Sequence, residues 1–147
     1  SPVEIRKPLH KIPIFPFQEI LIGGSKYASL SAEPHHLGEL SEYPFISLAK
    51  DTGTRELYAE YFLNHSLAFH PDMEAATTDQ ILPMVEYNLG IGFYPEELAR
   101  DALKSRTVCR IPLIEEAPKR EICLIINPWQ HQNAAAKELI GELLERV

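Results

Sequence analysis

The sequence contains only two cysteines, Cys109 and Cys123, and they do not form a CxxC pair. This scarcity excludes a disulfide scaffold and a cysteine zinc site, and it fits a reducing cytoplasm. No apolar run approaches the roughly 20 residues that cross a bilayer, and no basic start followed by an apolar stretch suggests export. We therefore expect a cytoplasmic protein with no membrane partner.

Basic residues are also scarce. The chain has 14 Lys and Arg against 21 Asp and Glu, which gives a formal net charge of -7 at pH 7. Such a charge repels phosphate backbones and removes the attraction that dominates nucleic-acid affinity. The 147 residues, 45% of them hydrophobic, are enough to bury a core in one domain or two small lobes. We expect a folded chain that does not bind DNA by itself.

Motifs of enzyme chemistry are absent as well. The sequence has no GxSxG elbow, no P-loop and no HExxH helix. His35 and His36 are adjacent, so their side chains point in different directions, and no ligand spacing completes a metal site. Cys109 and Cys123 lie in apolar runs, where thiols are usually inert. We expect no catalytic residue, no cofactor and no metal.

Apolar strands alternate with amphipathic helices along most of the chain. Four prolines in the first sixteen residues predict an extended connection there. In the first predicted helix, Arg55, Glu56 and Glu60 fall on the solvent side. The periodicity predicts strands at Phe17–Gly23, Phe45–Leu48, Asp72–Ala76, Ile91–Tyr94, Val108–Leu113 and Ile122–Ile126, and helices at Thr54–Asn64, Ile81–Leu89, from Pro95, and around Ala135–Leu144. This order predicts an α/β fold with mostly parallel sheets and right-handed crossovers.

Three segments together resemble the effector-binding domain of LysR-type transcriptional regulators. They are LSEYPFISLAKDTGTR at residues 40–55, FHPDMEAATTDQILPMVEYNLGIGFYP at residues 69–95, and APKREICL at residues 117–124. The most specific element is the helix that ends in NLGIGFYP, where a glycine turn, a short strand and a proline-started helix follow in order. Each piece is weak alone, but the ordered set covers about 110 residues.

The resemblance implies a fold similar to periplasmic binding proteins, with two α/β lobes joined by two crossing strands and a small effector between them. Residues 1–30 and 119–147 would share the first lobe, and residues 31–118 would form the second. The first lobe would be incomplete, and its exposed sheet edge would favour self-association. The family's helix-turn-helix is not found in this sequence, so DNA contact would need that further domain. The full regulator would act as a dimer or higher oligomer that senses a metabolite.

Two loops follow predicted strands and are the candidate binding sites. At Thr52, Gly53 and Thr54, glycine allows close approach of the backbone and the helix start favours anions such as a carboxylate. These residues could equally serve as a helix cap, but the resemblance implies that this loop lines the effector cleft. Thr78 belongs to a capping box, and the resemblance implies that it also meets the ligand.

Two further residues are weaker candidates for the first lobe. The resemblance places Phe17 near a position that reaches the cleft, although core packing explains a phenylalanine equally well. It also places Ser1 at a strand end there, although Ser1 can simply mark the start of the chain.

Two other functions remain open at this point. A solute-binding protein of a transporter would have the same broad fold, although the missing export signal speaks against it. An α/β enzyme with a general base at Asp51 or Asp79 is less well supported, because the sequence shows no paired acidic groups. Turnover of a bound ligand would distinguish an enzyme from a sensor.

Overall fold

The computed structural model describes the backbone of residues 10–126 with Glu138 and Gly141, and the side chains of residues 18–119. The chain forms two compact units, one of residues 18–119 and the other of residues 1–17 with 120–147. We call residues 18–119 the central unit. The expected lobe boundaries near residues 30 and 118 stay a prediction, and the helix expected around 135–144 lies outside the described residues, as does Ser1.

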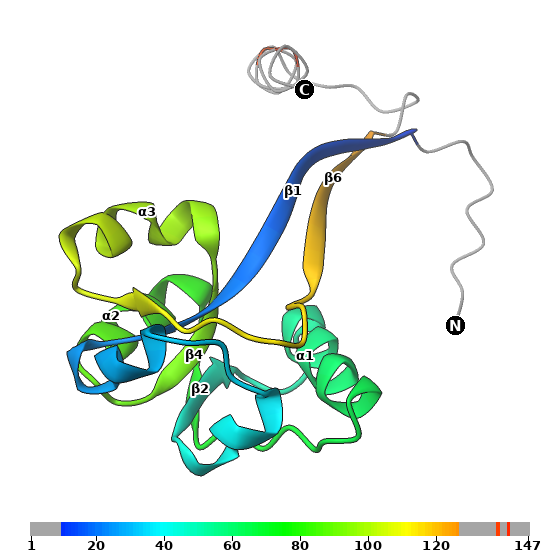
Figure 1. Cartoon of the computed structure of the whole chain (residues 1–147). Helices are drawn as coiled ribbons and strands as arrows, with labels where there is room; N and C mark the ends of the chain where they lie inside the picture. The colour runs from blue at the N-terminus through cyan, green and yellow to red at the C-terminus, as the bar shows by residue number, and fades with distance from the viewer. Residues whose placement is uncertain (1–9, 127–137, 139–140, 142–147) are drawn as a thin grey trace. The chain divides into compact units, whose positions relative to one another are not determined.

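Strands and helices alternate through the central unit (Figure 1). The strands are β1 (His10–Gly23), β2 (Phe45–Leu48), β3 (Met73–Ala75), β4 (Ile91–Pro95), β5 (Cys109–Arg110) and β6 (Lys119–Ile126). The α-helices are α1 (Gly53–Asn64), α2 (Thr78–Glu86) and α3 (Glu96–Ser105), and two 3-10 helices, η1 (Ser25–Ser31) and η2 (Leu37–Glu42), follow β1. The predicted α/β class is confirmed.

The sheet has the strand order β3-β2-β4-β1-β5, and β6 pairs with β1. Strand β2 is parallel to both β3 and β4, whereas β1 is antiparallel to β4 and β5. The core of the sheet is therefore parallel, as predicted. All four residues of β2 are buried, Ser47 included, which explains why its apolar residues do not alternate with exposed polar ones.

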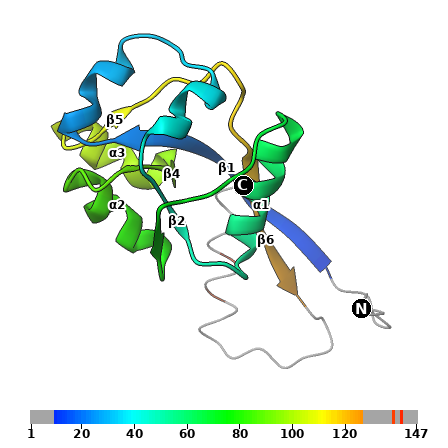
Figure 2. The same ribbon diagram turned by 90° about the horizontal axis from the view of Figure 1, so that it is seen from below.

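The helices cover opposite faces of this sheet (Figure 1 and Figure 2). Alternation along β1 sends Leu21 to one face and Ile20 and Ile22 to the other. The Leu21 face packs against α1 in an aromatic cluster, where Tyr58 stacks on Phe93 with ring centroids 4.7 Å apart. The Ile20 face packs against α2 and α3. Each face thus holds its own hydrophobic core.

Two strand predictions differ most from the structure. Strand β1 begins at His10 and not at Phe17, so the prolines at 13 and 16 belong to a strand; proline has an extended φ and lacks only a hydrogen-bond donor. Strand β5 contains only Cys109 and Arg110 instead of Val108–Leu113. Beyond it, Pro112 offers no N–H to a ladder, and the chain instead forms an isolated bridge from Leu113 to His35.

Candidate functional site

The carboxyl ends of the three parallel strands lie at one edge of the sheet. We call this the carboxyl edge; β2 ends there at Leu48, β3 at Ala75 and β4 at Pro95. Helix α1 follows β2 on one face, whereas α2 and α3 follow β3 and β4 on the other face. Neighbouring strands whose helices leave on opposite faces create a switch point, where open α/β sheets bind ligands. The fold therefore has switch points on both sides of β2.

Thr52 is the N-cap of α1 at this edge. Its Oγ1 accepts a hydrogen bond from the Arg55 N–H at 3.1 Å and donates one to the Ala49 carbonyl at 3.1 Å. Thr52 thus caps the helix with its oxygen, as the capping interpretation requires, and its hydroxyl proton is already used within the protein. What remains for a ligand is a lone pair of this oxygen and the N–H groups of Gly53 and Thr54, which have no acceptor inside the helix.

Gly53 is exposed, and a Cβ built on it would meet no atom within 4 Å. The fold therefore does not need a glycine at this position to avoid a clash. Thr54 is half-buried beside it, at the second position of α1. Asp51 precedes the cap with a φ of 71°, a left-handed conformation that aspartate tolerates better than most residues. The loop presents backbone and hydroxyl groups, with one carboxylate next to them.

Arg55 holds this loop against the sheet. Its Nη1 donates to the Leu48 carbonyl at 3.1 Å and to Glu74 Oε1 at 3.3 Å, and its guanidinium lies over the Phe69 ring. The side chain is only 12% exposed, so the prediction that Arg55 lies on the solvent side was wrong. The sequence spacing could not show this, because it depends on contacts with the Leu48 carbonyl at the end of β2, with Glu74 of the neighbouring strand β3, and with Phe69.

Thr78 is the first residue of α2 and is half-buried at the same edge. The predicted capping box is not formed: Thr77 is the N-cap but its hydroxyl makes no cap bond, and Gln80 Oε1 accepts instead from the N–H of Ala76, the residue before the cap, at 3.0 Å. Asp79 follows directly. The pKa of Tyr94 is raised, mainly by burial and further by the negative charges of Asp79 and Glu86. Thr78 thus sits in an acidic setting.

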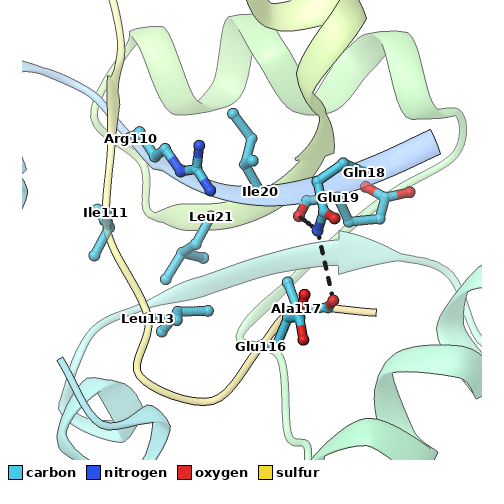
Figure 3. Close-up of a pocket in the computed structure, with 9 residues that line it drawn as sticks. All are labelled: Gln18, Glu19, Ile20, Leu21, Arg110, Ile111, Leu113, Glu116 and Ala117. Carbon is cyan, nitrogen blue, oxygen red and sulfur yellow. Dashed lines mark hydrogen bonds between the residues drawn. The ribbon is translucent and has the colours of Figure 1, made fainter. Parts of the chain in front are cut away.

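A small pocket of about 170 Å³ opens beside β1 (Figure 3). Glu19, which is 1% exposed, pairs with Pro95 and so lies at the carboxyl edge. Gln18 Nε2 donates to the Ala117 carbonyl across this pocket at 3.5 Å. Arg110 and Glu116 add charged groups to its wall. Sequence analysis missed these residues; the one signal was a glutamate within the apolar run that forms β1.

The other sequence candidates are placed as follows. Phe17 belongs to β1, but its side chain lies outside the described residues. His35 and His36 bind carboxylates: His35 Nδ1 is 3.3 Å from Glu39 Oε2, and His36 Nδ1 is 3.0 Å from Glu115 Oε1. Among the side chains of residues 18–119, no group of three or more metal ligands gathers. No helix in the described part of the chain is long and apolar enough to cross a membrane.

Comparison with known proteins gives one consistent result. The family described as LysR substrate binding domain matches residues 4–147. A curated relative, the uncharacterised HTH-type transcriptional regulator YeiE of Escherichia coli K12, is 23% identical over 122 residues. That match covers 83% of this chain, and the chain spans 42% of the length of YeiE.

Two solved structures share the fold. The CcmR regulatory domain of Synechocystis PCC6803 in complex with 2-PG has a TM-score of 0.78 and 16% identity, over 99% of this chain and 69% of that one. The effector binding domain of QuiR in complex with shikimate has a TM-score of 0.75 and 16% identity, over 99% and 68%.

Proposed function

This chain belongs to the family of LysR substrate-binding domains, and from that premise we propose that it senses a small metabolite for a transcription regulator. The effector would bind at the carboxyl edge, to the loop of Thr52, Gly53 and Thr54 and to Thr78. We propose Phe17 as a further ligand-binding residue, as the resemblance implies. Binding would occur without turnover, in the cytoplasm.

The observation that carries this proposal is the pair of switch points on either side of β2. Helices α1 and α2 begin at the same edge of the sheet but cover opposite faces, so the first N–H groups of both helices lie at that edge. The Thr78 hydroxyl has no hydrogen bond within the described residues and can donate to a ligand. A site made of N–H and hydroxyl donors suits a ligand with oxygen acceptors.

A small carboxylate is the ligand class that this edge favours. Two helix starts attract negative charge, while Asp51 and Asp79 oppose more than one such charge. QuiR was solved with shikimate, a hydroxylated monocarboxylate, which makes shikimate the first probe; 2-PG, with which CcmR was solved, has a phosphate besides its carboxylate and tests the expected limit on negative charge. We propose an effector with a single carboxylate and several hydroxyl groups.

The effector would act through an equilibrium between arrangements of the full regulator. A ligand shifts such an equilibrium only by its difference in affinity for the two states. We propose that the regulator is a dimer or higher oligomer. Its DNA contact would come from the HTH part of the regulator, because this chain spans only 42% of an HTH-type relative.

A thermal-shift screen of the 147-residue chain tests the proposal. The panel contains shikimate, 2-PG, other small carboxylates, amino acids and aromatic acids. A ligand that binds the native state raises the melting temperature. The shift should be lost in Thr54→Val and in Thr78→Val. It should remain in Thr107→Val, because the Thr107 hydroxyl donates to the Ala102 carbonyl near the end of α3, away from this edge. A shift unchanged in all three variants would place the ligand elsewhere, and turnover of the ligand would favour an enzyme.

A further inference from the structure

A second pocket lies at the opposite edge of the sheet from Thr52 and Thr78. The strand register sets Gly23, at the end of β1, beside Cys109 of β5, and Ile22 beside Gly92 near the start of β4. The pocket there has a volume of about 370 Å³, against about 170 Å³ for the pocket of Figure 3. Its walls come from the start of η1, the end of α3 and β5. We call it the amino-edge pocket.

Two arginines form the rim of this pocket. Arg106 is the C-cap of α3 in a left-handed conformation, with φ 62°, and it makes no salt bridge with any residue that the structure describes. Arg110 Nη1 is 3.5 Å from Glu96 Oε1, and both side chains are about half exposed. An exposed pair of this kind contributes little, so a ligand carboxylate can compete for Arg110. Arginine side chains at the rim of a pocket favour an anion, in a chain that is acidic as a whole.

The inner wall of the pocket is apolar. Val108 is buried, and Leu103 is half-buried against the same core. Burial raises the pKa of the Cys109 thiol, so this group stays neutral, and its Sγ donates to the Tyr27 carbonyl at 3.9 Å. Ser25 Oγ accepts from Asn88 Nδ2 at 3.2 Å and keeps its own proton for a ligand. An apolar wall with a cationic rim suits a molecule that has an apolar body and one anionic group.

We propose that the amino-edge pocket binds a small carboxylate with an apolar body, such as an aromatic carboxylate, independently of the effector site. The carboxylate would bind Arg106 and compete with Glu96 for Arg110, accept a hydrogen bond from Ser25, and rest its apolar part on Leu103 and Val108. The site goes beyond the proposed function, because it uses none of the residues proposed to bind the effector, which are Thr52, Gly53, Thr54, Thr78 and Phe17. A ligand here can couple to the effector through the shared sheet, and such coupling is reciprocal.

Benzoate is the probe for this site, and backbone amide NMR is the readout. Titration of the 147-residue chain should shift the amides of Ser25, Ala28 and Cys109 and leave those of Gly53 and Thr78 unchanged. Arg106→Gln should weaken benzoate binding by roughly tenfold or more, because it removes a charge-assisted hydrogen bond. Arg100→Gln is the matched control, since Arg100 is exposed on α3 and pairs with Glu97. Benzamide, which has the same apolar body and no charge, should bind more weakly than benzoate.

Each other result overturns the proposal. The absence of shifts with benzoate, equal binding of benzamide, or equal affinity in Arg106→Gln would each show that no such anion site exists. Shifts confined to Gly53, Thr54 and Thr78 would overturn it as well, but they would support the proposed function. If Arg106→Gln lowers the melting temperature, Arg106→Lys separates charge from folding, because it should recover part of the affinity.

Discussion

His36 Nδ1 lies 3.0 Å from Glu115 Oε1, which joins the start of η2 to the segment before β6. The other carboxylate oxygen, Oε2, accepts from the Leu37 N–H at 2.7 Å. The carbonyl of Glu115 accepts from the Tyr61 hydroxyl at 3.0 Å, and burial, with the nearby Glu115 charge, raises the pKa of Tyr61 to about 12, so this donor stays protonated. Glu115 therefore fixes its segment to two other elements.

These contacts make the stability of the chain depend on pH. Burial alone would raise the pKa of Glu115, but hydrogen bonds from His36 and from the Leu37 N–H outweigh it and lower this pKa below the ordinary 4.5. A lowered pKa in the folded state adds stability above the unfolded pKa, and this stability is lost as the pH falls through the folded value. We expect Glu115→Gln to lower the free energy of unfolding by about 1 kcal/mol at neutral pH. This loss should shrink as the pH falls below the ordinary pKa of glutamate.

Urea unfolding at several pH values measures this effect. Glu116→Gln is the matched control, because Glu116 is exposed and its Oε1 is 3.6 Å from Lys119 Nζ in an exposed pair. That variant should change the free energy of unfolding by less than about 0.5 kcal/mol. A Glu115→Gln cost that does not shrink in acid would show that the carboxylate charge is not what holds the segment.

The two N-cap threonines should respond differently to the same substitution. Thr52 Oγ1 accepts from the Arg55 N–H, whereas the Thr77 hydroxyl makes no cap bond. Thr52→Val should therefore lower the free energy of unfolding by about 1 kcal/mol, and Thr77→Val by less than about 0.5 kcal/mol. Chemical denaturation of both variants, with Thr52→Ser as the conservative replacement, measures the difference. Equal costs would mean that the cap bond adds no stability.

Arg55 should matter more for folding than a surface arginine. Arg55→Leu leaves the Leu48 carbonyl without its side-chain donor and Glu74 without its cation, and we expect a loss of about 1–3 kcal/mol. Arg100→Leu removes only an exposed pair with Glu97 and should cost less than about 0.5 kcal/mol. Melting curves of the two variants test this difference, and a similar melting temperature for both would refute it.

The parts that local pattern governs were predictable from the sequence. Strand β2 was predicted at both ends, because Phe45, Ile46 and Leu48 form a short run, with Ser47 among them, between Pro44 and a polar turn. The start of α1 was predicted within one residue, because the Thr and Gly of the loop mark a helix start. The family resemblance, which the match over residues 4–147 confirms, rests on such ordered local patterns.

Features made by distant parts of the chain could not be predicted. The inward position of Arg55 depends on Glu74 and Phe69, which reach it only once β3 pairs with β2. Likewise, the pocket of Figure 3 is lined by Gln18 and Ala117, which are 99 residues apart and come together only in the folded chain. No periodicity in the sequence predicts this contact. The binding roles of Thr52, Gly53, Thr54, Thr78 and Phe17 stay predictions.

Alanine substitutions at two glycines should distinguish an effect on folding from an effect on ligand binding. A Cβ on Gly90 would lie 2.6 Å from the Pro44 carbonyl oxygen, which accepts from the Ile91 N–H at 2.9 Å, so the backbone cannot move without loss of that bond. Gly90→Ala should therefore cost about 1–3 kcal/mol. Gly53→Ala meets no atom within 4 Å and should leave stability unchanged or raise it by up to about 1 kcal/mol.

The same pair tests the carboxyl-edge site. If the effector approaches the backbone of Gly53, the added methyl group should weaken its binding while the melting temperature of the free protein does not fall. Gly90→Ala should show the reverse pattern: a lower melting temperature, with an effector affinity close to wild type below that temperature. Thermal-shift titrations of both variants supply the two quantities at once. Unaltered effector affinity in Gly53→Ala would count against close approach of the ligand at the start of α1.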